Sequence, residues 1–207
     1  MQAILWKATK ATYKMDRNFD IKNELLKYTP YNDQEKSDIA NILSYLDKEE
    51  NLYTRENKAY HFTASAWVTN QSHDKVLMVY HNIYNSWSWL GGHADGEKNL
   101  LNTAIREVRE ESGISKVVPV SDDIFSVEII PVEGHLKKGK YISSHLHLNV
   151  TFLLQADDTQ KISVKEDENS AVGWFSLEDA IDASTEDWFK KRIYPKLNKK
   201  LQSFFIL

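Results

Sequence analysis

One stretch, from Gly91 to Ile114, constrains the fold more than any other part of the chain, because a glycine-rich turn there leads directly into a strongly patterned helix. It reads GGHADGEKNLLNTAIREVREESGI. At about 100° per residue, a helix through this stretch places a set of apolar side chains on one face. They are Leu101, Ala104, Ile105 and Val108. The pattern predicts a helix packed on a core and preceded by a loop.

Three carboxylates form a second cluster at the edge of that face, since spacings of three and four residues bring helical side chains together. They are Glu107, Glu110 and Glu111. Gly113 is the natural left-handed cap of the helix, so all three lie near its end, where the macrodipole is negative. Like charges at these spacings also repel, by about a few tenths of a kcal/mol per pair. Their charge therefore needs compensation.

Two kinds of cation can supply it. Arg106 precedes Glu110 by four residues and can hold one carboxylate in position. A hard divalent cation can neutralise the others, because Mg²⁺ and Mn²⁺ take oxygen ligands and tolerate clustered carboxylates. The alternative is a solvated acidic helix end with ordinary surface ion pairs. That alternative explains neither the glycines at positions 91, 92 and 96 nor the place of Glu111 beside the apolar face, so the metal site is favoured.

The same residues resemble the signature of the Nudix hydrolases. That signature runs Gly, five residues, Glu, seven residues, Arg-Glu, an aliphatic residue, any residue, Glu-Glu, any residue, Gly and an aliphatic residue. The residues that match at the right spacing are Gly92, Arg106, Glu107, Val108, Glu110, Glu111, Gly113 and Ile114. Lys98 stands in place of the first glutamate, with Glu97 beside it as a steric substitute. This departure lies outside the Arg-Glu and Glu-Glu pairs, so it bears on detail and rate more than on reaction class.

The resemblance implies a fold, an activity and a cofactor. The fold is of the α/β class, an α/β/α sandwich around a mixed sheet. The activity is hydrolysis, with Mg²⁺ or Mn²⁺, of a pyrophosphate bond in a nucleoside diphosphate linked to another group, X. The substrate would be a small phosphorylated compound, a nucleotide derivative. X stays open among nucleoside triphosphates, sugar nucleotides, ADP-ribose, dinucleoside polyphosphates and coenzymes, because all present the same pyrophosphate.

Roles for the box residues also follow from the resemblance. The three glutamates of the cluster are expected to bind the metal, with Arg106 orienting them. The loop at Gly91 and Gly92 is expected to shape the site, and Gly92 to lend a carbonyl ligand. Nudix proteins often carry one further carboxylate in a later loop, as general base or extra ligand. By analogy Glu168 is the first candidate and Glu166 the second; an exposed acidic turn is the alternative for this loop.

Two functions compete with the hydrolase interpretation. A Nudix-fold regulatory module would hold a nucleotide without cleaving it, and only Lys98 favours this, against an intact set of three glutamates. Isopentenyl-diphosphate isomerase is a Nudix relative that relies on a cysteine, and this chain has no cysteine. The hydrolase therefore remains the preferred interpretation.

The composition of the chain limits the kinds of partner and site that we expect. A hydrophobic fraction of 42% over 207 residues indicates a folded globular protein. A formal net charge of −4 argues against the basic surface that binds large nucleic acids. The absence of cysteine excludes disulfides and zinc–thiolate sites. No apolar run of about 20 residues occurs, and lysines interrupt the N-terminus, so we expect a cytoplasmic protein without membrane contact.

The chain divides into two parts. Residues 1–58 contain no glycine and are expected to be a helical N-terminal extension, with helices at Ile21–Tyr28 and Asp33–Glu50 packed on the main domain. A substrate lid or a homodimer contact is the functional alternative. Residues 59–207 are expected to be the Nudix domain. Its expected strands and short helix are His61–Val68, Lys75–His81, Val117–Val120, Ile124–Val132, His145–Gln155, Val172–Phe175 and then Leu177–Ala183. A final helix should begin near Ser184, with an apolar stripe of Trp188, Ile193, Leu197 and Leu201 and a kink at Pro195.

Basic and histidine residues supply the last candidates. The segment 133–144 carries Lys137, Lys138 and Lys140, which either form a solvated hairpin tip or contact substrate phosphates. His145 and His147 share one face of a strand and, with His93, raise the alternative of a zinc or iron site. No third ligand lies at a diagnostic spacing from the His145 and His147 pair. Ordinary sheet histidines or a substrate contact, assigned to His147, are therefore favoured.

Overall fold

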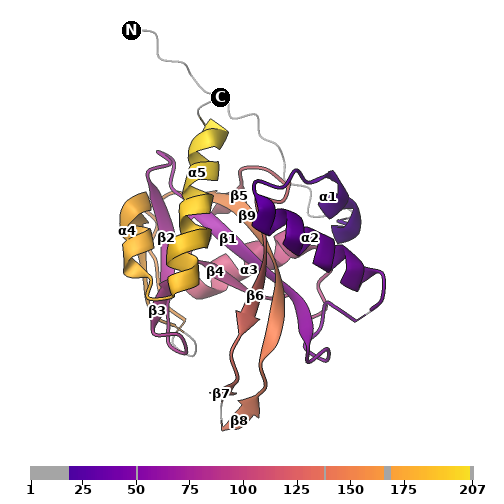
Figure 1. Ribbon diagram of the computed structural model, residues 1–207. Helices are drawn as coiled ribbons and strands as arrows, with labels where there is room; N and C mark the ends of the chain where they lie inside the picture. The colour runs from indigo at the N-terminus through magenta and orange to yellow at the C-terminus, as the bar shows by residue number, and fades with distance from the viewer. Residues whose placement is uncertain (1–18, 50, 138, 166–168, 206–207) are drawn as a thin grey trace.

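The computed structural model describes residues 19–49, 51–137, 139–165 and 169–205, and a mixed, curled sheet flanked by helices forms its centre (Figure 1). The helices are α1 (Ile21–Lys27), α2 (Asp33–Leu46), α3 (Leu100–Ser112), α4 (Leu177–Ala183), the π-helical segment η1 (Phe189–Ile193) and α5 (Tyr194–Phe205). The strands are β1 (Tyr60–Thr69), β2 (Lys75–His81), β3 (Ser86–Ser88), β4 (Leu90–His93), β5 (Val117–Pro119), β6 (Ser126–Val132), β7 (His135–Lys137), β8 (Lys140–Ile142), β9 (His145–Ala156) and β10 (Asn169–Ser176). The expected α/β class, with helices before and after the sheet, is confirmed.

Strand β1 is the hub of the sheet. Along one edge it pairs in parallel with β9, from Tyr60 opposite Leu146 to Thr69 opposite Gln155. Along its other edge it pairs antiparallel with β4 from Thr63 to Ala66 and with β2 at Thr69. Strand β6 then continues the sheet beyond β9. The start of β1 therefore lies between the end of β4 and the start of β9, which brings together residues far apart in the sequence.

The two faces of the sheet are covered by different helices. Alternate residues of β1, such as Phe62 and Ala64, pack in one apolar cluster with the buried face of α3. The intervening residue Trp67 packs in a second cluster with Tyr194 and Leu197 of the C-terminal helix. We call these sides the α3 face and the α5 face; α3 lies behind the sheet and α5 in front of it in Figure 1. The sandwich expected from the resemblance follows from this division.

Helix α2 covers the outer edge of β6. Its N-cap is Asn32, and it ends at Leu46, earlier than the predicted Glu50, because no apolar residue continues the helical stripe. Gln34 donates to the carbonyl of Val127 at 3.1 Å, and Asp38 accepts from the N–H of Ile129 at 2.9 Å. These bonds satisfy backbone groups that an edge strand would otherwise leave unpaired.

A buried ionic network joins α2, β6 and α5 on the α5 face. Lys196 lies 2.8 Å from a carboxylate oxygen of Glu128 and 3.2 Å from one of Glu35. All three residues are at most 4% exposed. Lys200 adds a second cation 3.1 Å from Glu35. Glu128 also accepts a hydrogen bond from the side-chain amide of Asn149 in β9. The network therefore links helices α2 and α5 to the central strands of the sheet.

The C-terminal helix corrects one prediction. Trp188 was expected in its apolar stripe, but it is 48% exposed and the adjacent Phe189 is buried in its place. The reason is a change of helical register: the N–H of Tyr194 bonds to the carbonyl of Phe189, five residues back, immediately before Pro195. Proline cannot donate a backbone hydrogen bond, which agrees with the interruption expected there. In the described part of the chain, no helix is long and apolar enough to cross a membrane.

Candidate active site

Helix α3 forms as its sequence predicts. Asn99 caps its N-terminus by accepting from the N–H of Asn102 at 3.4 Å. Gly113 ends it with a positive φ of 69°, and its N–H bonds to the carbonyl of Arg109. The predicted apolar face is buried. The acidic cluster consequently lies at the C-terminal end of a helix that is fixed against the sheet.

Glu111 is held from two directions. It is only 4% exposed, and one carboxylate oxygen accepts from the backbone N–H of Gly91 at 2.9 Å. The other oxygen accepts from the side-chain amide of Asn169 at 3.0 Å. Both donors favour the ionised carboxylate. The loop before α3 and the start of β10 therefore position this glutamate together.

Glu107 occupies the space that a side chain at Gly92 would need. A Cβ atom at Gly92 would lie 2.5 Å from Cδ of Glu107 and 2.6 Å from its Oε1. Arg106 lies 2.7 Å from that same Oε1 and 3.7 Å from Glu110, and it also donates to the carbonyl of His93 at 3.3 Å. Arg106 thus ties two carboxylates to the loop at the end of β4, and Gly92 must be a glycine for Glu107 to sit there.

The third carboxylate faces solvent. The side chain of Glu110 is 43% exposed and lies 3.4 Å from Nζ of Lys165. Lys165 and Asn169 flank the acidic loop in the sequence, so each end of that loop contacts one carboxylate of α3. Glu166 and Glu168 lie outside the described residues.

Glu97 and Lys98 lie at the other end of α3. The carboxylate of Glu97 accepts from the N–H of Asn99 at 2.7 Å, where a negative charge is favourable to the helix dipole. Lys98 is exposed. Glu97 therefore serves the start of the helix, away from the carboxylates near Gly113.

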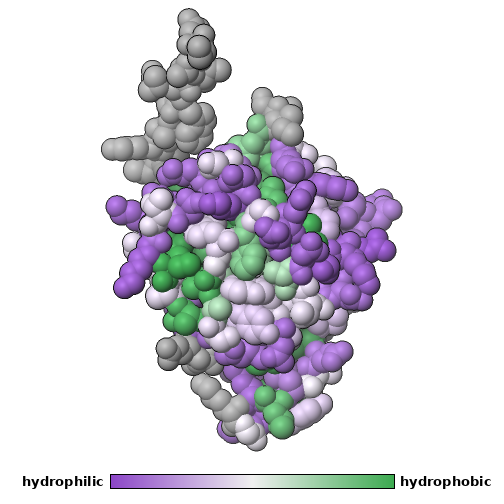
Figure 2. Space-filling view, turned by 90° about the vertical axis from the view of Figure 1, so that its left-hand side faces the viewer, coloured by the Kyte–Doolittle hydropathy of each residue, from purple (hydrophilic) through white to green (hydrophobic). Residues whose placement is uncertain are grey.

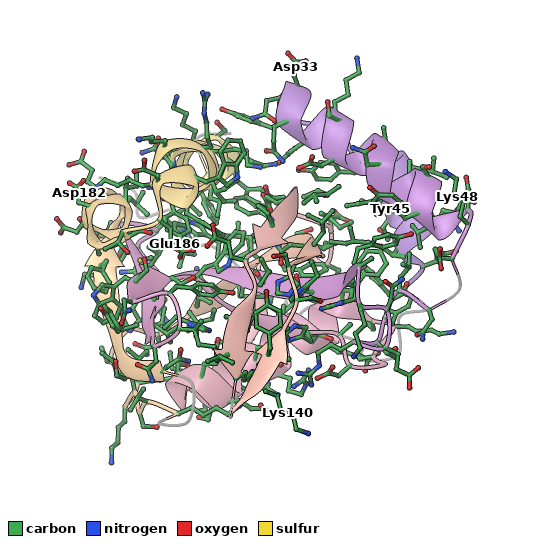
Figure 3. The ribbon with its side chains drawn as sticks, turned by 60° about the horizontal axis from the view of Figure 1, so that its bottom comes forward. Asp33, Tyr45, Lys48, Lys140, Asp182 and Glu186 are labelled. Carbon is green, nitrogen blue, oxygen red and sulfur yellow. The ribbon has the colours of Figure 1, made fainter. Side chains whose placement is uncertain are left out.

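The predicted lysines lie on the β7–β8 hairpin. Lys137 and Lys140 face each other across its turn, and Lys138 lies outside the described residues. The hairpin projects below the sheet in Figure 1, and the labelled Lys140 lies at the periphery in Figure 3. Figure 2 shows a small hydrophobic patch at this lower end and a larger one higher on the same face. On the hairpin, Leu136 is 72% exposed.

Four histidines meet on the α5 face, where the sequence indicated three. His147 lies opposite His61 in the β1–β9 ladder, and His93 lies opposite Thr63, on the same face. The nearest ligand atoms of His61, His93, His145 and His147 all lie within 4.8 Å of one another. We call these four residues the histidine cluster. His61 was missed because nothing near it in the sequence marks it as a ligand.

The acidic cluster offers only oxygen donors, the type that Mg²⁺ and Mn²⁺ prefer. The family model of the NUDIX domain matches residues 59–197, well over half of the chain. The chain belongs to the NUDIX family. The matched region starts where the alternating pattern of β1 begins, and it contains every box residue.

The NUDIX relatives that this chain resembles are named for different substrates. The chain is 28% identical over 124 residues to an RNA pyrophosphohydrolase of Pelagibacter ubique, covering 58% of this chain and 77% of that one. It is 25% identical over 112 residues to the asymmetrical bis(5'-nucleosyl)-tetraphosphatase of Mus musculus, covering 54% and 69%. The expectation of a Nudix-type pyrophosphohydrolase is thereby confirmed as a class.

The solved structures agree on the fold. A C. elegans Ap4A hydrolase in a binary complex superposes with a TM-score of 0.50 at 21% identity, covering 70% of this NUDIX protein and 97% of that chain. Nearly all of that smaller protein is matched, so the unmatched part of this chain has no counterpart in it.

Proposed function

We propose that this NUDIX protein hydrolyses a pyrophosphate bond in a nucleoside diphosphate linked to another moiety, with Mg²⁺ or Mn²⁺ as cofactor. The observation that carries the proposal is the double anchoring of Glu111, by the N–H of Gly91 and the amide of Asn169, beside Glu107. Such preorganised carboxylates are what a diphosphate-bound cation needs.

The residues divide the work as follows. Glu107, Glu110 and Glu111 would hold the cation, and the carbonyl of Gly92 would add a ligand. A bound divalent cation would supply neutralisation of the phosphoryl charge and would acidify the attacking water. Arg106 keeps two of the carboxylates in place through its contacts of 2.7 and 3.7 Å.

Glu168 accepts the proton of the attacking water, or serves as an extra ligand, with Glu166 as the second candidate. The contacts of Lys165 with Glu110 and of Asn169 with Glu111 support this assignment, because these residues precede and follow the pair in the chain. A general base must come within hydrogen-bond reach of the water that it deprotonates.

The substrate class is a small nucleotide derivative. The names of both relatives, one for RNA pyrophosphate hydrolysis and one for dinucleoside tetraphosphate cleavage, support nucleotide-linked phosphoanhydrides as the first compounds to test. Lys137, Lys138 and Lys140 of the hairpin would contact phosphate oxygens. His147, the other residue that the sequence assigned to substrate, belongs to the histidine cluster.

Three further proposals concern the setting of the enzyme. Residues 1–58 form an extension of the NUDIX domain at 59–207, supported by the bonds between α2 and β6. The protein acts in the cytoplasm. A homodimer contact would use the outward surface of α2, which begins at Asp33 in Figure 3 and ends at Leu46, just before the labelled Lys48; light scattering on the purified protein tests it.

The test is phosphate release, coupled to a phosphatase, from a panel of nucleoside triphosphates, sugar nucleotides, ADP-ribose and dinucleoside polyphosphates. We expect turnover with Mg²⁺ or Mn²⁺ that is lost on chelation and falls by at least about a hundredfold in Glu111→Gln. Glu178→Gln, an exposed carboxylate on α4, is the matched control and should keep wild-type activity.

Lys98 favours one second candidate, a nucleotide-binding module without catalysis. That candidate gains if no compound turns over while a nucleotide still raises the melting temperature. Lys98→Glu should then create activity, whereas an active wild-type protein rules the candidate out.

A further inference from the structure

The histidine cluster has the geometry of a metal site that the NUDIX reaction does not use. Its members come from three strands: His61 from β1, His93 from β4, and His145 and His147 from β9. Ring centroids lie 5.1 Å apart for His61 and His93, 4.9 Å for His93 and His147, and 5.0 Å for His61 and His145. Each ring thus faces the others around a common centre.

Two of the rings have their ligand atom fixed by the backbone. Nδ1 of His61 lies 3.0 Å from the carbonyl of Asn57, and Nδ1 of His145 lies 2.8 Å from the carbonyl of Ser143. A carbonyl only accepts, so Nδ1 carries the proton in both rings. In the neutral ring Nε2 then holds a lone pair. Metal-binding histidines commonly have this second contact, which orients the ring and sets its tautomer.

The lone pair of His61 is buried with no visible partner. His61 is 4% exposed, and its Nε2 has no hydrogen-bond partner among the described residues. A buried polar atom left in this way is costly and calls for an explanation, of which a bound ion is one. The same nitrogen is the one that faces the cluster, since Nδ1 is taken by Asn57.

The pair on β9 indicates the size of the ion. Nε2 of His145 and Nε2 of His147 are 3.1 Å apart, and without a metal one must donate a proton to the other. Two nitrogens on one tetrahedral zinc ion, each at 2.0–2.1 Å, lie about 3.3–3.4 Å apart. A cation between these two rings would need their nitrogens to separate by only a few tenths of an ångström, whereas the four ligand atoms together, which lie within 4.8 Å of one another, would move closer.

The donor set selects the kind of ion. All four side chains offer imidazole nitrogens, and the backbone contacts of His61 and His145 leave Nε2 of each ring as the lone-pair donor. Imidazole nitrogens match zinc or another late first-row ion and not Mg²⁺, which prefers oxygen.

We propose that the histidine cluster binds one Zn²⁺ or similar transition-metal ion as a structural site, separate from the Mg²⁺ site on α3. Four protein ligands leave no open position for substrate, as is usual for structural zinc. His93 directly follows Gly92, and its carbonyl accepts from Arg106. The two sites lie on opposite faces of β4, because adjacent strand residues point to opposite sides. The ion would fasten the catalytic loop to β1 and β9.

The experiment is calorimetric titration of chelator-treated protein with Zn²⁺ alone, with His61→Gln, His147→Gln, Glu111→Gln and His81→Gln alongside. We expect one Zn²⁺ per chain in the wild-type protein, with the dissociation constant raised at least about tenfold in His61→Gln and His147→Gln. His81→Gln, which alters a histidine outside the cluster, and Glu111→Gln should bind as wild type. Zinc should also raise the melting temperature of wild type and of these two controls.

A second readout guards against misfolded variants. Circular dichroism should show the cluster variants folded without metal, and Co²⁺ added to wild type should give the visible spectrum of tetrahedral coordination. The proposal is overturned if folded wild-type protein binds no Zn²⁺, if the cluster variants bind it as tightly as wild type, or if binding is lost in Glu111→Gln instead.

Discussion

Lys196 is the residue whose removal should destabilise this protein most clearly through charge. It lies 2.8 Å from Glu128 and 3.2 Å from Glu35 in a region at most 4% exposed. At an effective dielectric constant of 20, each contact contributes about 5 kcal/mol of attraction, most of it offset by desolvation. Removing one partner of such a buried pair costs about 3–5 kcal/mol, because the other charge is left unpaired. Since Lys200 remains 3.1 Å from Glu35, we expect about 3 kcal/mol for Lys196→Met.

The assay is urea unfolding followed by tryptophan fluorescence, at several pH values. Burial alone would raise the pKa of Glu35, but the charges of Lys196 and Lys200 outweigh it and the pKa is lowered. A lowered carboxyl pKa stabilises the fold above the unfolded value of 4.5 and loses that effect as pH falls. The difference between wild type and Lys196→Met should therefore be largest at neutral pH and shrink below about pH 4.5.

Lys191→Met is the matched control. Lys191 pairs with Asp187 at 2.6 Å, but the two side chains are 65% and 80% exposed. Surface pairs contribute about 0–1 kcal/mol, so this variant should unfold nearly as wild type does. A loss below about 1 kcal/mol for Lys196→Met, or one that is the same at every pH, would refute the reasoning.

Three further perturbations address the site and the pH dependence. Gly92→Ala should displace Glu107 and lower kcat by about a hundredfold. Gly173→Ala should not, because its new Cβ atom would lie 3.5 Å from Phe175, an ordinary van der Waals contact; equal kinetics in the two variants would contradict the role of the close approach at Gly92. Asn169→Ala should weaken activation by Mn²⁺ about 10–100-fold, measured as activity against metal concentration; unchanged activation would show that Glu111 does not need this donor. Burial raises the pKa of Glu186 to about 7, and in Figure 3 this residue lies inward of α4. The fold favours the protonated form of Glu186, so the protein loses stability as pH rises from 4.5 to about 7. Glu186→Gln should therefore be more stable than wild type by about 1–2 kcal/mol at pH 8, after allowance for partial exposure, and equally stable near pH 4. Urea unfolding at both pH values checks this, and a gain that does not depend on pH would be inconsistent with it.

Helix α3 could be predicted well because several local signals agree on it. The apolar period, the acidic edge and the cap at Gly113 all lie within one continuous stretch, and the structure places them as expected. Agreement between local signals is what makes a segment predictable. The pairing of Arg106 with Glu110 was likewise a consequence of helical spacing.

Contacts between distant strands could not be predicted in this way. His61 and His147 meet only because β1 and β9 pair in parallel, and nothing local to either residue encodes that register. Glu35 lies in the first turn of α2, where acidic residues are common, yet it is fully buried against Lys196. Asn169 lies at the end of the acidic loop, and its bond to Glu111 depends on where β10 starts. Tertiary pairing decides all three.

The central claim is that catalysis depends on the carboxylates near the end of α3. The most direct test compares kcat/KM, on the best substrate found, for Glu111→Gln and Glu97→Gln. Glu97 belongs to the same box region, but its carboxylate bonds to the N–H of Asn99 at 2.7 Å, and glutamine keeps that acceptor. We predict a loss of at least about a hundredfold for Glu111→Gln and less than about threefold for Glu97→Gln. Comparable losses in the two variants, or full activity in Glu111→Gln, would contradict the account.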